Sequence, residues 1–292
     1  MLQRYSAEKI YGDLHSLGIK KGDILLLKVN VLSTGLICND PKSGFLNCLL
    51  EYLGPNGTIA APAYTTSYFL PFFNRKKKIF STRDAPNTGA FAKSMLIHPD
   101  SLRSIHPTNS FVAIGKYAKE ILCDHDDQSH SYQPVRNLIE LGAKGLIVGC
   151  LDSNPGHLTA HLAQYDLDQS TKNIFKGLSG ACFYKNGELK VFLRKDFGGH
   201  ASGAIKFHDY YDQNGAIEYG KVGNADSGIS LLRDSYEIEK YIFQKDAKFM
   251  LCSDPLCFSC RATWRYNLGD IPRYVLRKLI YFVKNKVKQN ET

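Results

Sequence analysis

The chain has 292 residues, of which 43% are hydrophobic and 22% are charged. This length and composition are typical of a globular protein with a packed core, and they exclude a mostly disordered chain. The formal net charge is +9. Such an excess favours anionic partners (phosphates, nucleotides, coenzymes or an anionic membrane surface) about as much as it favours a merely solubilising surface.

No targeting or membrane-spanning segment is predicted. Polar and charged residues such as Arg4, Glu8 and Lys9 interrupt the start of the chain, and no apolar run is long enough to cross a bilayer. We therefore expect a cytoplasmic location, where the eight cysteines stay reduced.

The first half of the chain alternates between helical patterns and short apolar runs. In chain order, these patterns predict a helix over 5–18, a strand over 24–27, a helix over 43–53, a strand over 58–62, the end of a helix at 138–141 and a strand over 145–149. Such alternation is typical of a layered α/β/α domain around a central mixed or largely parallel sheet.

The second half has a different pattern. Residues 181–193 predict a hairpin that turns at Asn186 and Gly187, residues 234–245 a helix, and residues 250–252 a last strand. No linker or repeat divides the chain, so we expect a single domain over 1–270 and a basic helical tail over 271–292.

Several motifs, taken in order, resemble the aminoglycoside 3-N-acetyltransferase family. They span roughly residues 5–255, and Arg-Ser-x-His-Pro-x-x-Ser, which starts at Arg103, is the most specific. The motifs lie at 17–23, 54–64, 85–90, 102–110, 145–149, 157–163 and 220–225. The resemblance implies a CoA-dependent N-acyltransferase that acylates an amino sugar, with acyl-CoA as co-substrate and no metal.

Acylation of an amine needs a base, because a sugar amine at neutral pH is mostly ammonium and has no free lone pair. Histidine suits this task, since its pKa is ordinarily near 6.5. His161 is the first candidate: it follows the 145–149 strand, where open α/β sheets bind ligands, and the resemblance implies the same role. A helix histidine bonded to a local carbonyl is the alternative.

His106 is the second catalytic candidate. It shares a loop with Arg103, Ser104 and Ser110, and the resemblance implies that this loop shapes the acyl-CoA site, where the planar Arg103 guanidinium could bind phosphate. A network that braces the loop explains the same residues about as well, and we expect cofactor contact here more than proton transfer.

The chain departs from the family pattern at two places. Where relatives commonly carry a glutamate three residues after the histidine, this chain has Gln164, so the carboxylate partner of the base must come from elsewhere; Asp84, Asp209 and Asp226 are candidates. Where the family has His-Ser-Ser-Leu, this chain has a segment that starts at Lys28.

Cofactor and acceptor contacts are predicted as follows. The small and polar residues after the first strand are expected to approach the coenzyme; they are Asn30, Val31, Leu32, Ser33, Thr34 and Gly35. Polar residues around the expected base are assigned to the acceptor; they are Asp84, His157, Thr159, Gln164, His200 and His208.

Two further segments invite other interpretations. Cys252, Cys257 and Cys260 resemble part of a zinc or iron–sulfur site, but three thiols without a suitable histidine are too few, and we expect no metal. The basic, amphipathic segment 271–288 could dock on an anionic membrane, on its own domain or on a second subunit. No nucleic-acid motif accompanies the charge.

We therefore expect an acyl-CoA-dependent N-acyltransferase that transfers an acetyl or short (hydroxy)acyl group by direct attack, with a histidine base. The basic chain and Gln164 favour a nucleotide-linked amino sugar for surface glycan synthesis as the acceptor. The alternatives are an aminoglycoside acceptor, as in antibiotic resistance, and a catalytically inactive relative that binds coenzyme or a glycan precursor.

Overall fold

The computed structural model describes residues 4–37, 44–69, 79–153, 155–169, 179–194, 201–254, 257, 272–273, 275–277 and 279–280. His200, Cys38 and Cys260 lie outside these residues. Among the described helices, none is long and apolar enough to cross a membrane.

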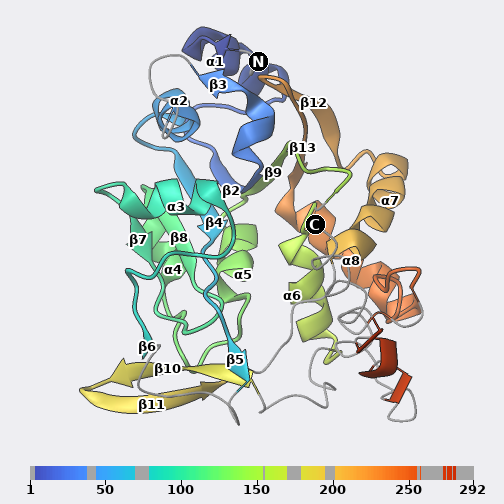
Figure 1. Ribbon diagram of the computed structural model, residues 1–292. Helices are drawn as coiled ribbons and strands as arrows, with labels where there is room; N and C mark the ends of the chain where they lie inside the picture. The colour runs from blue at the N-terminus through green and yellow to red at the C-terminus, as the bar shows by residue number, and fades with distance from the viewer. Residues whose placement is uncertain are drawn as a thin grey trace, which may run out of the picture.

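A seven-stranded mixed sheet forms the centre of the molecule, in the order β12-β13-β9-β2-β4-β8-β7 (Figure 1). Its strands are β2 (Ile24–Val29), β4 (Thr58–Pro62), β7 (Leu102–Arg103), β8 (Phe111–Gly115), β9 (Lys144–Val148), β12 (Glu218–Val222) and β13 (Ala225–Leu231). The three central strands β9, β2 and β4 run parallel, and antiparallel strands flank them on both sides. The predicted mixed central sheet is confirmed.

Helices cover both faces of this sheet. One face packs on α1 (Ala7–Ser16), α2 (Gly44–Leu53) and α3 (Ala90–Ile97). The other packs on α4 (Ala118–Leu122), α5 (Gln133–Glu140), α6 (Leu158–Asp166), α7 (His208–Gln213) and α8 (Leu232–Lys245), together with the 3-10 turn η4 (Ala201–Phe207).

The first four residues of β2, Ile24 to Leu27, form a continuous apolar run because both faces of the strand are covered there. Leu25 and Leu27 lie in the core cluster beside α1 and α2, whereas Ile24 and Leu26 lie in the cluster beside α5 and α8. Successive side chains of a strand point to opposite faces, so a strand covered on both sides must be apolar at every position. The layered α/β/α architecture follows from this arrangement.

A second, smaller sheet carries the hairpin β10 (Ser179–Lys185) and β11 (Glu188–Leu193) with the short strands β5 (Tyr68–Phe69) and β6 (Ile79–Phe80). The hairpin turns at Asn186 and Gly187. Both residues have positive φ, +54° for Asn186 and +79° for Gly187, as a two-residue hairpin turn of this type requires. Figure 1 shows the hairpin at the end of the molecule remote from α1. A two-stranded parallel pair of β1 (Arg4–Tyr5) and β3 (Leu36–Ile37) completes the strands.

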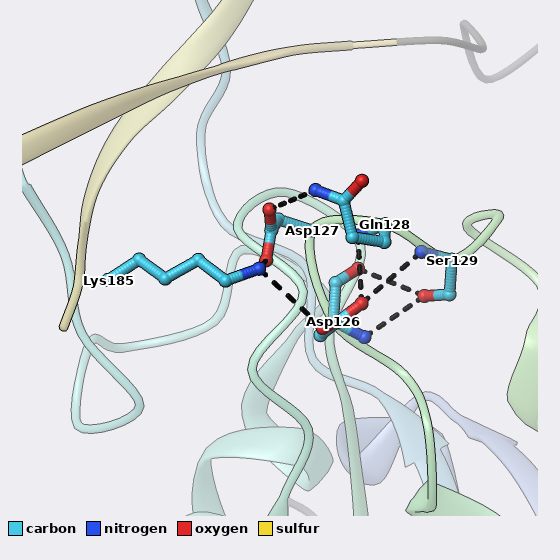
Figure 2. Close-up of polar contacts among 5 residues, drawn as sticks. All are labelled: Asp126, Asp127, Gln128, Ser129 and Lys185. Atoms are coloured by element: carbon cyan, nitrogen blue, oxygen red, sulfur yellow. Dashed lines mark hydrogen bonds and ion pairs between the residues drawn. The ribbon is translucent and has the colours of Figure 1, made fainter.

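The hairpin is anchored by a polar contact that Figure 2 shows. The ammonium of Lys185 donates to Oδ1 of Asp127 at 2.6 Å, and the loop that presents Asp127 is held by Ser129, whose hydroxyl accepts from the Asp126 amide at 3.0 Å. On the other strand, buried Phe192 packs edge-on against the His106 ring, with 4.8 Å between ring centroids. Polar and aromatic contacts together hold the hairpin against the loop before β8, which carries His106, and the loop after α4 (Ala118–Leu122), which carries Asp127.

The predicted last strand at 250–252 is wrong. Residues 247–250 form a turn, and residues 251–252 have no regular structure. The ammonium of Lys206 donates to the carbonyls of Phe249 and Leu251 at 3.1 and 2.7 Å, so these backbone groups are satisfied by a side chain instead of a neighbouring strand.

In the basic C-terminal tail, residues 272–273, 275–277 and 279–280 are helical. The docking of this tail on a membrane stays a prediction.

One glycine in β8 allows two strands to approach closely. A Cβ at Gly115 would lie 2.2 Å from the carbonyl oxygen of Gly57, and its φ of +119° suits only glycine. We expect Gly115→Ala to lower the free energy of unfolding by about 3 kcal/mol, from overpacking together with backbone strain. Urea unfolding measures the loss. Gly142→Ala is the control, because Gly142 also has positive φ but nothing within 4 Å of its added Cβ; an equal loss in both variants would remove the steric explanation.

Candidate active site

A cavity of about 520 Å³ lies where β2, β4 and β9 meet helix α6. Parallel strands bring their carboxyl ends to one edge of a sheet, and this edge is where open α/β sheets bind ligands. The chain leaves β9 at Val148, passes through the loop before α6 and returns with His157 and His161 lining the cavity. The order of the strands therefore places both imidazoles in the lining of the same cavity.

Helix α6 presents His161 toward the cavity. The ring stacks on that of Tyr132, with 5.1 Å between centroids and 17° between planes, so its orientation is fixed by an aromatic neighbour. Burial lowers the pKa of His161 to about 4, although the side chain keeps some solvent-accessible surface; Gln164 opposes the shift, and the cations Arg194 and Lys28 add to it. At neutral pH the imidazole is uncharged and can accept a proton.

Lys28 enters the cavity from the end of β2. The loop residue Gly156 has φ +58°, and a Cβ there would lie 2.0 Å from the Lys28 ammonium, so a larger residue would strain the backbone and displace the end of the lysine side chain. Burial lowers the pKa of Lys28, and the neighbouring Cys150 opposes that shift. Arg194, which follows β11, also lines the cavity. Among the described lining residues there is no aspartate or glutamate.

The residues assigned to the acceptor are placed at different sites. His157 and Thr159 line the main cavity, and Gln164 is fully buried beside His161. His208 contacts His157, with 3.3 Å between their Nε2 atoms. Asp84 lies elsewhere: it lines a separate cavity of about 360 Å³ beside Phe80 and Pro107.

The guanidinium of Arg103 forms hydrogen bonds within the protein, as the alternative of a loop-bracing network expects, and its contact with the coenzyme stays a prediction. The guanidinium donates to the Ser110 hydroxyl at 3.0 Å and to the carbonyls of Thr82 and Ala63 at 3.1 and 2.6 Å. A fourth bond reaches the carbonyl of Asp84. The side chain thus ties the segment 81–85 to β4 and β8, and its donors are used within the protein.

His106 belongs to the same hydrogen-bonded loop, and its catalytic role stays a prediction. It is fully buried, its Nδ1 accepts from the amides of Thr108 and Asn109 at 3.3 and 3.0 Å, and its ring stacks on His125 at 4.8 Å. Ser104 bonds inside the same loop, with the amide of Phe111 and the ring of His125. None of these side chains lines the main cavity.

The segment assigned to the coenzyme follows β2 as the 3-10 turn η1 (Val31–Thr34). The side-chain amide of Asn30 and the hydroxyl of Ser33 donate to the carbonyl of Gly149 at 3.5 and 3.4 Å, which joins this turn to the loop after β9. Thr34 is fully buried, whereas Leu32 is 75% exposed. Lys28 and Val29 line the cavity, but residues 30–35 do not, so their coenzyme contact stays a prediction.

The carboxylate partners proposed from sequence do not contact His161. Asp226 is exposed and pairs with Lys221 at 3.4 Å, and Asp209 lies near His208. The sequence reasoning missed Glu239, the one carboxylate that is buried among the described residues. A signal was present: Glu239 shares a helical stripe with Tyr236, Ile242 and Phe243, which places an acid on the buried face of α8.

Within the described residues, no three histidine, cysteine or acidic side chains gather closely enough to hold a metal ion. Cys252 and Cys257 belong to this part of the chain. The expectation of a metal-free reaction stays a prediction.

Comparison with known proteins supports the family resemblance. The curated aminoglycoside N(3)-acetyltransferase VIII of Streptomyces fradiae is 25% identical over 158 residues, which cover 48% of this chain and 54% of the relative. The match therefore spans about half the length of that relative, and the same holds for the type VII enzyme of Streptomyces paromomycinus.

Two solved structures have the same fold. A mutant of aminoglycoside acetyltransferase AAC(3)-IVa in complex with a gentamicin superposes with a TM-score of 0.76 at 20% identity, over 90% of this chain and 98% of that one. AAC-IIIb in a binary complex with CoASH superposes with a TM-score of 0.72 at 20% identity, over 83% of this chain and 97% of that one. The family model of aminoglycoside 3-N-acetyltransferases matches residues 26–244. Because this model matches well over half of the chain, the chain belongs to the aminoglycoside 3-N-acetyltransferase family.

Proposed function

We propose that the protein is a CoA-dependent N-acyltransferase that acetylates an amino group of an aminoglycoside. Family membership and the activities of the named relatives support this acceptor, which the sequence analysis held as the alternative, better than a nucleotide-linked amino sugar. The observation that carries the proposal is an uncharged imidazole, His161, at the edge of a cavity built by the carboxyl ends of parallel strands.

In the proposed reaction His161 removes a proton from the sugar ammonium. The freed amine lone pair forms a bond to the thioester carbon, and the carbon–sulfur bond then breaks, with its electron pair remaining on sulfur. The carbonyl oxygen becomes negative during the attack, and the charges of Lys28 and Arg194 supply positive potential in the same cavity. Tyr132 holds the plane of the base through ring stacking.

One observation favours the second candidate, a nucleotide-linked amino sugar. The described lining of the cavity contains the cations Lys28 and Arg194 and no carboxylate. A polycationic aminoglycoside meets like charge there, whereas a diphosphate meets opposite charge. This acceptor, and its use in surface glycan synthesis, remains a hypothesis that rests on the charge of the lining.

We expect His161→Ala to lower kcat by about 10² to 10⁴, the usual contribution of general-base catalysis, with little change in KM for acetyl-CoA. Release of CoA thiol with an amine acceptor measures the rate. His15→Ala is the matched control, since His15 is exposed on α1, outside the cavity lining. An unchanged rate in His161→Ala would mean that another group is the base.

The pH profile should report the lowered pKa of His161. A base acts only when unprotonated, so activity should be lost as the pH falls through about 4, below the usual histidine range. Because the Lys28 charge lowers this pKa, Lys28→Met should move the acid limb of kcat/KM to higher pH. Lys21→Met, at an exposed turn, should leave the limb in place; a limb that moves equally in both variants contradicts the local electrostatic cause.

A direct comparison of the two acceptor classes, as substrates for acetyl-CoA-dependent acylation, identifies the acceptor. We expect acetyl-CoA to react faster with gentamicin than with a nucleoside-diphosphate-linked amino deoxysugar if the family acceptor applies. The reverse order, together with a loss of turnover of the nucleotide sugar in Arg194→Ala, establishes the second candidate. Tight CoA binding without thiol release for either acceptor identifies a catalytically inactive binding protein.

A further inference from the structure

A buried polar cluster lies behind the cavity and joins three helices. It contains His157 at the start of α6, His208 and Tyr211 on α7, and Glu239 on α8. The Nε2 atoms of His157 and His208 are 3.3 Å apart, and Nδ1 of His157 is 4.0 Å from Oε1 of Glu239. Because His157 also lines the cavity, the cluster reaches from the cavity wall into the helical layer.

Glu239 is an unusual residue for the interior of this fold. Its side chain is fully buried, one oxygen accepts from the Tyr211 hydroxyl, and the other, Oε2, has no hydrogen-bond partner among the described residues. A buried carboxyl without a cationic partner costs stability, and an apolar side chain at this position would avoid that cost. Such a group is typical of a functional network.

The protonation states of the cluster suit proton transfer. Burial raises the pKa of Glu239 to about 8, against the hydrogen bonds of Tyr211 and Thr159. Burial also lowers the pKa of His157 to about 3, with His208, Lys28 and His161 adding to the shift. At neutral pH a protonated acid and an unprotonated imidazole therefore lie side by side. If Nε2 of His157 passes its proton to His208, Glu239 can give its own proton to Nδ1 of His157 and keep that imidazole neutral.

The outer end of the cluster is negatively charged. His208 is half-buried, and although burial lowers its pKa, the carboxylates of Asp212, Asp152 and Asp209 favour its protonated form. Tyr219 of β12 faces the same ring, 6.4 Å away between centroids. A proton that reaches His208 therefore meets acidic groups at the surface.

Acylation of an ammonium must release one proton. The substrate nitrogen starts with three hydrogens and keeps one; the sulfur of CoA takes one to become a thiol, and the last goes to solvent. His161 cannot start a second turnover until it has lost that proton. His157 lies one helical turn before it and lines the same cavity.

We propose that Glu239, His157 and His208 form a route that carries this proton from the cavity to the acidic surface at Asp209 and Asp212. The cavity-lining Thr159 hydroxyl passes the proton to the Glu239 carboxylate, Glu239 gives it to Nδ1 of His157, and Nε2 of His157 gives its own proton to His208. The proposal rests on the proposed acyl transfer. His157, His208 and Glu239 act through His161 and are therefore positioning and relay residues.

We expect His208→Ala to lower kcat by on the order of tenfold to a hundredfold, less than loss of the base itself, with KM for acetyl-CoA unchanged. Imidazole and its methylated derivatives in the buffer should restore the rate in the order of their pKa, because they replace a proton carrier. Gln213→Ala, on the exposed side of α7, should behave as wild type without any buffer effect. Rescue that follows the size of the derivative, or no rescue in a folded variant, overturns the relay.

Glu239→Gln keeps an acceptor for the Tyr211 hydroxyl but cannot release a proton. We expect it to slow kcat, and the double variant with His208→Ala to be no slower than the slower single variant, because both changes interrupt one route. Additive losses contradict a shared route. Circular dichroism and urea unfolding establish that each variant is folded.

A measurement without turnover separates this inference from the proposed function. In the resting protein, ¹⁵N NMR of the imidazoles should show one of the two facing Nε2 atoms protonated and the other accepting, and His157→Phe should abolish this pairing. If wild-type protein acylates no amine but shows the pairing, the proposed function fails alone. If it acylates amines and the pairing is absent, the relay fails alone.

Discussion

The parallel pairing of β2 with β9 is the constraint on which the site depends. Its register sets Lys28 opposite Ile147 and Val29 opposite Val148, so both strands end at the same level. The loop after β9 then passes directly over the Lys28 side chain, and Gly156 is the residue that lets it do so without a clash. Since α6 begins after this loop, the close contact at Gly156 also sets where His157 and His161 stand in the cavity.

This geometry makes the cavity around His161 electrostatically positive, unlike a site in which a carboxylate pairs with the histidine. Lys28 and Arg194 bring positive charge to the cavity, and their charges, added to burial, keep His161 unprotonated. A neutral imidazole is ready to accept a proton but holds it weakly, which makes prompt removal of that proton valuable. The low pKa of His161 and the proton route that we propose are therefore consistent with each other.

The sequence predicted those parts of the site that depend on local pattern. The apolar run of β2, the strand before the loop and the position of His161 follow from periodicity and motif order, because a buried strand must be apolar on both faces. Arg103 shows the limit of such reasoning. In sequence, its donors look the same whether they bind phosphate or carbonyls, and the fold shows that the carbonyls of Ala63 and Thr82 accept from them. The burial of Glu239 could have been predicted from sequence, because this acid lies in an otherwise apolar helical stripe.

The replacement of the family-typical glutamate by Gln164 gains a physical explanation from this arrangement. A carboxylate on α6 beside His161 would hold the imidazole charged, in a cavity that already contains two cations. Here the buried carboxyl instead belongs to α8 and lies against His157, one turn before the base. In the mechanism that we propose, this position of the acid separates acceptance of the proton, by His161, from its removal through His157.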